Sequence, residues 1–208
     1  AIQPEGQTNF EGILEKIRQI TEEIDKPVIA KETGAGISAE DARKLEGAGV
    51  KGIDISGAGG TTFAAVEYYR AKRRHEGFQR GLGQVFWDWG IPTAVSLIEV
   101  SQTVKIPVIA SGGIRDGTEI AKALTLGASL TSLSHPILVE AVKGVKETKA
   151  ALSTLIEELK TAMFLVGATS VHSLAEKPVI ITGKTAEWLK LRGFNIEAYA
   201  RRGKNERN

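Results

Sequence analysis

The feature that most constrains the fold of this chain is a repeated order of short apolar run, glycine-rich loop and helical segment. The order occurs three times, and a fourth apolar run followed by a helical segment continues it. Parallel strands require such crossovers, because the chain must return to the start of the sheet before it pairs again. The first run, Pro-Val-Ile-Ala, is typical of a strand buried on both faces. The runs that we predict as strands are residues 27–30, 52–55, 107–110 and 130–133.

Helical patterns surround these strands. Apolar residues recur at helical spacing over 10–24, and Asn9 is a suitable N-cap for that helix. Ser38, with Asp41 three residues later, resembles a capping box that begins the next helix. A polar and aromatic stretch at 63–91 interrupts the pattern, and insertions of this length often serve as lids or interfaces. Further helices are predicted at 93–104, at 118–126 and from about Pro136.

Four parallel strands with helical crossovers fit either a small open sheet or half of an eight-stranded barrel. The chain has 208 residues and begins at Ala1 without a methionine, whereas a complete barrel takes about 250 residues. We therefore predict the last four strands of a TIM (β/α)8 barrel over residues 1–145, and a C-terminal helical extension with a basic tail over 146–208. The extension contains a strongly amphipathic helix. Its apolar face consists of Leu152, Leu155, Ile156, Leu159, Ala162, Met163 and Val166.

Composition narrows the classes of partner. The formal net charge of +2 gives no electrostatic case for binding nucleic acid. The chain has no cysteine, so disulfides and thiolate metal sites are excluded. No apolar run approaches the roughly 20 residues of a membrane span, and no signal peptide is recognisable. We therefore expect a cytoplasmic protein that does not enter a membrane.

The strongest functional signal lies in the loops after the last two predicted strands. Gly112 and Gly113 form a glycine turn before a helix, and Ser134 and His135 lead into the next helix. Backbone N–H groups at such turns bind anions, and barrels commonly bind phosphate between the last two strand loops. The alternative is that the two glycines only make a tight turn between strand and helix.

Two further loops carry candidate ligand-binding residues. Lys31 follows a predicted strand directly, so its ammonium group is expected at the mouth of the barrel, where it would stabilise an anionic ring or a phosphate. The alternative is a structural ion pair with Glu32 or Asp54. Ser56 and Thr61 flank a loop with three glycines, and either bind a ligand or cap the turn.

The candidates for acid–base chemistry are less well defined. The carboxylates Glu32, Asp54 and Glu67 have suitable chemistry, but their spacing is not that of metal ligands. His75 lies in a basic helical segment and His172 in the C-terminal extension, and both are expected to be surface or structural residues.

Several motifs carry a resemblance to a known family. The segment Ala110–Gly117 resembles the FMN-phosphate segment of many flavin-binding barrels. Together with three further motifs, it makes the chain resemble type II isopentenyl-diphosphate isomerase up to about Phe194. The further motifs are Gln3–Gly6 with Asn9–Phe10, Lys31–Gly34 with Gly36–Ser38, and Asp54–Thr61.

This resemblance implies an enzyme that interconverts isopentenyl diphosphate and dimethylallyl diphosphate. It implies reduced FMN as cofactor, Mg²⁺ to hold the diphosphate, and NADPH to keep the flavin reduced. Lys31 would face the flavin ring, Ser56 and Thr61 would also contact FMN, and the remaining residues would cradle its phosphate. The FMN-binding set is Lys31, Ser56, Thr61, Gly112, Gly113, Ile114, Arg115, Ser134 and His135.

The chain also departs from the family pattern. The family's essential glutamine and its Mg²⁺-binding glutamate precede Ala1, so we expect no metal ligand in this segment and no turnover by the chain alone. Glu67 matches a glutamate near the family's active site and is the one catalytic candidate here. Phe63 lies near the position of a family tryptophan, and the family has Ala-Leu-Pro where Ser134–Pro136 stands. The expected partners are the N-terminal half of the barrel and further copies of the chain.

Three alternatives remain open at this point. A 2-hydroxy-acid oxidase needs a histidine base followed by an arginine after the second strand, where this sequence has Asp54–Ser56. Another FMN-dependent barrel oxidoreductase is a second alternative. The third is a non-catalytic, phosphate-binding half-barrel that self-associates to cover two open sheet edges.

Overall fold

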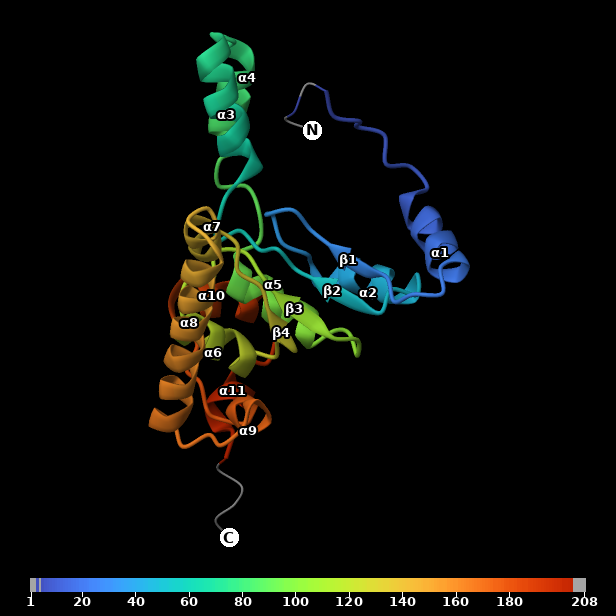
Figure 1. Cartoon of the computed structure of the whole chain (residues 1–208). Coiled ribbons are helices and arrows are strands. Elements are labelled where there is room, and N and C mark those ends of the chain that lie inside the picture. The colour runs from blue at the N-terminus through green and yellow to red at the C-terminus, as the bar shows by residue number, and fades with distance from the viewer. Residues whose placement is uncertain (1–2, 4, 204–208) are drawn as a thin grey trace.

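The structure is a computed structural model that describes residue 3 and residues 5–203; Pro4 of the N-terminal motif and residues 204–208 of the predicted basic tail lie outside the described residues. Its centre is a parallel sheet in which the spatial order of the strands equals their order in the chain (Figure 1). This continuous winding, without a reversal of strand order, is that of a barrel segment. The strands are β1 (Ile29–Lys31), β2 (Gly52–Asp54), β3 (Val108–Ala110) and β4 (Leu130–Thr131).

The sheet is buried in its middle and open at its edges. Ile53 of β2 pairs with Ala30 on one side and Val108 on the other, and it is completely buried. Ile29 and Leu130, on the two outer strands, are 51% and 60% exposed. The prediction that the first strand is buried on both faces is therefore wrong for Ile29, because among the described residues β1 has a neighbour on one side only.

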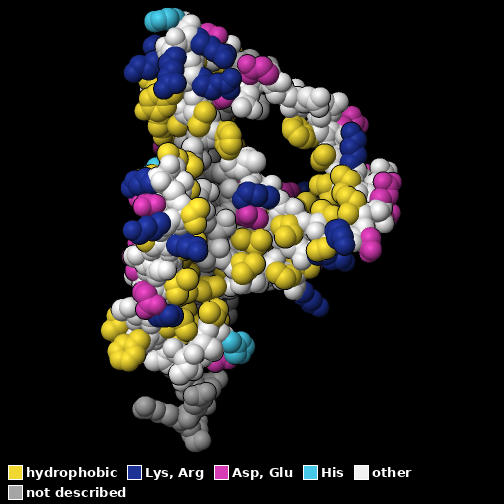
Figure 2. Space-filling view, in the orientation of Figure 1, with side chains coloured by type: hydrophobic (Ala, Val, Ile, Leu, Met, Phe, Trp, Pro, Cys, Tyr) yellow, Lys and Arg dark blue, Asp and Glu magenta, His cyan; other side chains and the backbone are white. Residues whose placement is uncertain are grey.

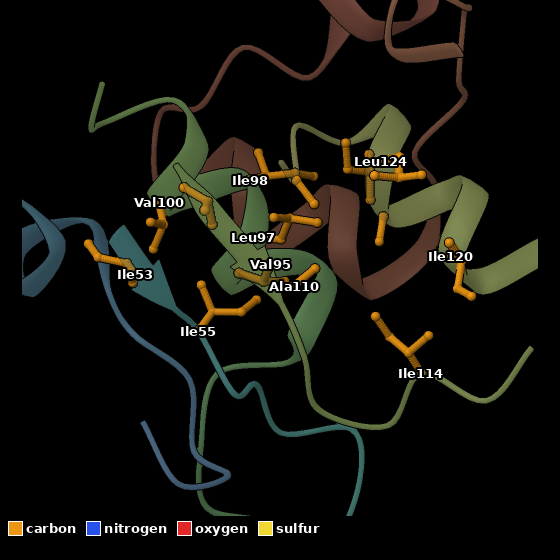
Figure 3. Packing of buried hydrophobic residues seen from close by; sticks show 14 of the residues in the cluster. Ile53, Ile55, Val95, Leu97, Ile98, Val100, Ala110, Ile114, Ile120 and Leu124 are labelled. Atoms are coloured by element: carbon orange, nitrogen blue, oxygen red, sulfur yellow. The ribbon is translucent and has the colours of Figure 1, made fainter. Parts of the chain in front are cut away.

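Helices on one side of the sheet close the core. Figure 3 shows Leu97 and Ile98, from the helix before β3, among the side chains of β2 and the loop after β3. Ser38 is confirmed as the N-cap of the helix that follows it, since its Oγ accepts a hydrogen bond from the Asp41 N–H at 3.1 Å. The reciprocal bond of the predicted capping box is not formed, because the Asp41 carboxylate accepts from the Ser38 hydroxyl group and from Lys44 instead. These helices are α2 (Ala39–Gly47), α5 (Thr93–Ser101) and α6 (Gly117–Thr125).

The first helix begins later than predicted. It is α1 (Ile13–Glu23), and its N-cap is Gly12, whose φ of 73° lies in the left-handed region. Asn9 instead accepts a hydrogen bond from the Glu11 N–H at 3.0 Å. Asn9 is therefore wrong as N-cap, because its side chain makes a local turn with the backbone two residues on.

The stretch predicted as an insertion forms a helical hairpin that extends away from the sheet (Figure 1). The hairpin comprises α3 (Phe63–Arg74) and α4 (Gly77–Val85). The rings of Tyr68 and Trp87 meet edge to face at 5.5 Å and hold its two arms together. Lys and Arg side chains gather at this end of the molecule (Figure 2).

The C-terminal part, which begins at α7, packs against α5 and α6, two of the helices that cover the sheet. Pro136 lies in the first turn of its helix, as predicted. Of the predicted apolar face, Leu155 is buried, whereas Leu152, Ile156 and Val166 are 45%, 51% and 48% exposed. No helix in the part of the chain that the structure describes is both long and apolar enough to span a bilayer. The helices are α7 (His135–Ala141), α8 (Val145–Leu165), α9 (Val171–Ala175), α10 (Gly183–Leu191) and α11 (Glu197–Arg201).

A buried carboxylate joins this C-terminal part to the barrel helices. Glu99 of α5 is 1% exposed and accepts hydrogen bonds from Trp188 Nε1 and Arg192 Nε, both at 3.2 Å. It also accepts the Ala39 N–H at the start of α2. Arg192 contacts Glu40 at 2.6 Å as well, and the hydrogen bonds with Glu99 and Glu40 raise the pKa of its guanidinium group. Three helices distant in sequence are thus held at one point.

Candidate cofactor site

The carboxyl ends of the four strands surround a cavity of about 610 Å³. This volume lies within the roughly 300–1,000 Å³ of small-molecule and cofactor sites. The lining is rich in hydroxyl groups, glycines and cationic side chains, and it contains no carboxylate. All nine predicted FMN-binding residues line it: Lys31, Ser56, Thr61, Gly112, Gly113, Ile114, Arg115, Ser134 and His135.

Two glycine loops that meet backbone to backbone form one wall of the cavity. Gly112 and Gly113 have φ of 104° and 84°, which glycine adopts without strain. A Cβ atom on Gly113 would lie 1.9 Å from the carbonyl oxygen of Gly59, in the loop after β2. Thr93 Oγ1 donates to the Gly112 carbonyl at 2.6 Å and so fixes the loop from α5. Glycine is required here for loop packing as well as for close approach of a ligand.

Arg115 lies across the contact between these loops. Its guanidinium group donates to the Gly113 carbonyl at 2.6 Å and to the Gly59 carbonyl at 3.0 Å. Helix α6 begins directly after it, and its N-cap Asp116 accepts hydrogen bonds from Thr118 Oγ1 and the following backbone, which lower the pKa of the Asp116 carboxyl group. The N-terminus of α6 is therefore filled by its own carboxylates, and the group that suits the phosphate of a nucleotide is the Arg115 side chain beside the glycine turn.

The opposite part of the cavity contains an ion pair. Lys31 Nζ donates to Asp54 Oδ2 at 2.6 Å, so the structural pairing that the sequence left open is present. The Lys31 side chain is nevertheless 53% exposed and lines the cavity, which leaves it accessible to a ligand. Glu32 is not its partner, since the Glu32 carboxylate accepts the N–H groups of Gly34 and Ala35 and shapes that loop.

Ser56 has an unusual backbone conformation at the floor of the cavity. Its φ of 37° lies in the left-handed region, which is uncommon for residues other than glycine. Its N–H donates to Ser111 Oγ at 3.1 Å and to Asp54 Oδ1 at 3.3 Å, while its carbonyl accepts the Gly36 N–H at 3.0 Å. Such conformations persist only where their surroundings fix them, and they concentrate at functional sites.

The structure places Glu67 away from this cavity lining. It is 4% exposed within α3, where it accepts hydrogen bonds from Arg70 at 2.7 Å and from Gln3 Nε2 at 3.3 Å. The hydrogen bond and charge of Glu67 raise the pKa of Arg70. Its catalytic role stays a prediction. His75 and His172 are exposed side chains, as expected.

Metal ligands do not cluster in the described part of the chain. No group of three or more His, Cys, Asp or Glu side chains within residue 3 and residues 5–203 is arranged to hold a metal ion. The site also contains residues that the sequence did not assign. Ser111 and Ser132 line the cavity and Thr93 fixes the glycine turn, but the sequence signals only a loop, a strand and a helix start at these positions.

A strand-end cavity with glycine loops and a cationic wall, on a segment of a parallel barrel, defines the class of phosphate-binding barrel proteins. Residues 6–181 match the FMN-dependent dehydrogenase family. The chain belongs to this family.

Within the family, the chain is similar to isopentenyl-diphosphate delta-isomerases. It is 52% identical over 202 residues to that of Methanothermobacter thermautotrophicus, an alignment that covers 97% of this chain and 56% of the relative. It is also 52% identical over 193 residues to that of Pyrococcus furiosus, covering 92% and 48% of the two chains. The chain thus spans about half the length of the curated relatives it matches.

Solved structures support the fold. A mandelate oxidase matches with a TM-score of 0.59 and 26% identity, over 78% of this chain and 40% of the other. A mutant (S)-mandelate dehydrogenase matches with a TM-score of 0.63 over 81% and 40%, and at 22% identity this likeness concerns the fold alone. The family and these neighbours are TIM barrels, so the prediction of a partial TIM barrel is confirmed.

Proposed function

We propose that this chain is the FMN-binding part of an enzyme that interconverts isopentenyl diphosphate and dimethylallyl diphosphate. One observation carries the proposal: the nine residues that the resemblance assigns to FMN come from the carboxyl ends of four different strands and the segments that follow them, and they line a single cavity. The similarity to isopentenyl-diphosphate delta-isomerases supports the same reaction.

The phosphate of FMN would bind between the loops after β3 and β4. The glycine turn at Gly112 and Gly113 offers backbone N–H groups, and Arg115 offers a charge-assisted hydrogen bond. Ser134 and His135 line the same cavity at the start of α7. The absence of any carboxylate from the lining favours an anionic group here.

The flavin ring would lie toward Lys31, Ser56 and Thr61. When bound, reduced FMN supplies proton-transfer chemistry without net redox change, and NADPH would keep it reduced. The Lys31 ammonium group would stabilise negative charge on the reduced ring, while the hydroxyl groups of Ser56 and Thr61 would orient it.

Among the described residues, no cluster of metal-binding side chains offers a site for the Mg²⁺ that would hold the diphosphate. We therefore assign Mg²⁺ binding to the part of the relatives' barrel that these four strands do not supply. We likewise propose that turnover needs that part of the barrel, that the protein forms a homo-oligomer, and that it works in the cytoplasm.

The 2-hydroxy-acid oxidase alternative is supported by the structural likeness to mandelate oxidases. It is opposed by the end of β2, where Asp54 and Ser56 stand in place of a histidine base. The two functions are separated by incubating the protein with reduced FMN, Mg²⁺ and isopentenyl diphosphate in one assay, and with oxidised FMN and mandelate in another. Formation of dimethylallyl diphosphate by a protein with all eight strands is expected. Turnover of isopentenyl diphosphate by a 208-residue monomer would instead locate the catalytic acid here, with Glu67 and Glu32 as first candidates.

FMN binding itself is tested by flavin-fluorescence titration of the Arg115→Ala variant. Charge-assisted hydrogen bonds contribute about 1.5–3 kcal/mol, so the dissociation constant for FMN should rise roughly ten- to hundred-fold. Arg18→Ala, which removes an exposed arginine of α1 that pairs only with Glu15 at 3.4 Å among the described residues, is the control and should leave it unchanged. Equal affinity of the Arg115→Ala variant and the unmodified protein would contradict the assignment.

A further inference from the structure

Asp54 is a buried carboxylate at the junction of three strands beneath the cavity. It ends β2, is 7% exposed, and interacts with Lys31 at the end of β1 and with the Ser111 hydroxyl group just after β3. It also accepts the Ser56 N–H at 3.3 Å. One side chain therefore organises the polar floor of the cavity, although it is not itself part of the lining.

The side chains that line the cavity carry positive charge without any negative charge among them. The side chains that line the cavity include Lys31, Arg115 and His135 but no carboxylate. Asp54 makes the closest charged contact of Lys31, at 2.6 Å. Two further acidic residues of these loops are engaged with the backbone: Glu32 accepts the N–H groups of Gly34 and Ala35, and Asp116 caps α6. Lys31 thus reaches the cavity as half of an ion pair rather than as an isolated cation.

We propose that Asp54 is a positioning residue that sets the preference of the site for reduced over oxidised flavin, by holding Lys31 in place and offsetting its charge. This inference rests on the proposed function, since it takes the ligand above Lys31 to be a flavin. It assigns to Asp54 a role separate from proton transfer and from direct contact with the cofactor.

The physical argument concerns the field at the flavin ring. A reduced flavin is anionic, so a nearby ammonium group stabilises it more than the oxidised ring, and a carboxylate bonded to that ammonium group opposes this effect. A lysine stem is flexible, and a short ion pair to a buried partner restricts where its charge lies. Removal of the carboxylate leaves the Lys31 charge uncompensated, whereas removal of the ammonium group leaves the Asp54 charge alone.

The measurement is the ratio of the dissociation constants of oxidised and reduced FMN, which reports the redox preference without reference to turnover. We compare the unmodified protein with Lys31→Met, Asp54→Asn and the double variant. Lys31→Met should lower the ratio and Asp54→Asn should raise it, each by roughly ten-fold for one unit charge about 10 Å away at an effective dielectric constant of about 20. The double variant removes both charges and should lie between the two single variants.

The control is Glu157→Gln, which removes a carboxylate that pairs with a lysine at 2.7 Å but lies on the exposed surface of α8. Its ratio should equal that of the unmodified protein. An Asp54→Asn ratio that is unchanged, or that moves in the same direction as in Lys31→Met, would overturn the proposal and leave Asp54 a structural anchor. If Asp54→Asn does not fold by circular dichroism, Asp54→Ser serves as the second variant that removes the carboxylate, with the same expected rise in the ratio. Failure of the unmodified protein to bind FMN in either state would instead refute the proposed function.

Discussion

Replacing Gly113 by alanine tests whether the contact between the two glycine loops builds the cofactor site. The new Cβ would lie 1.9 Å from the Gly59 carbonyl oxygen, where ordinary contacts begin at 3.4 Å, so the loops must separate by about 1.5 Å. Such a movement breaks the 3.0 Å hydrogen bond from Arg115 to Gly59 and strains the 2.6 Å bond from Thr93 to the preceding carbonyl. We expect the loss and strain of these two hydrogen bonds to lower the free energy of unfolding by about 2 kcal/mol.

A second contribution comes from the backbone, because a φ of 84° costs an L-residue about 1–2 kcal/mol. Gly193→Ala isolates this contribution: Gly193 has a φ of 78°, and no neighbouring atom lies within 4 Å of the Cβ it would gain. Urea denaturation should therefore show a loss of about 1 kcal/mol for Gly193→Ala and of about 3 kcal/mol for Gly113→Ala.

FMN titration completes the comparison. Gly193→Ala should bind FMN like the unmodified protein, whereas Gly113→Ala should bind at least ten-fold more weakly, since the displaced loop carries the backbone N–H groups. If both variants lose the same stability and keep the same affinity, the loop contact has no role in building the site.

Two further predictions concern stability. Arg192→Ala removes the charged partner of buried Glu99. Because Arg192 is itself 39% exposed, we expect the free energy of unfolding in urea to fall by about 2–3 kcal/mol. Arg18→Ala, at an exposed ion pair, should leave the free energy of unfolding almost unchanged, and equal losses in the two variants would contradict the argument. Asp116→Ala removes the N-cap of α6 and should cost about 1 kcal/mol at neutral pH. The pKa of the folded Asp116 carboxyl group is lowered, chiefly by the hydrogen bond from Thr118, so this stabilisation is present above the ordinary aspartate pKa of about 3.9 and disappears as the pH falls through the folded value. A difference between the two proteins that does not shrink as the pH falls below about 3.9 would contradict it.

The sequence predicted the four strands and the capped helix at Ser38, because each rests on local patterns. The family resemblance assigned nine residues that the structure gathers around one cavity, and their contact with FMN stays a prediction. The glycine turn at Gly112 and Gly113 is recognisable without knowledge of what packs against it. Contacts between distant segments were beyond that reasoning: nothing at Thr93 signals its bond to Gly112, and the choice of Asp54 rather than Glu32 as partner of Lys31 depends on strand register.

The same limit explains the two wrong expectations. Helical periodicity extends back to residue 10, but the left-handed Gly12 delays the start of α1, and Asn9 makes a turn instead of a cap. The apolar run at 27–30 reads as a fully buried strand, yet burial depends on a neighbour at the outer edge of β1, which a local pattern does not report.

The clamp at Glu99 has a consequence for the order in which the site matures during synthesis. Ser96 and Glu99 hold Ile37 and Ala39, just after the loop that borders the cavity, but the Glu99 charge is balanced by Arg192, which is made much later. A buried carboxylate without its cation disfavours packing of α5 on α2. The nascent chain should therefore keep this edge of the cavity loose until α10 has left the ribosome.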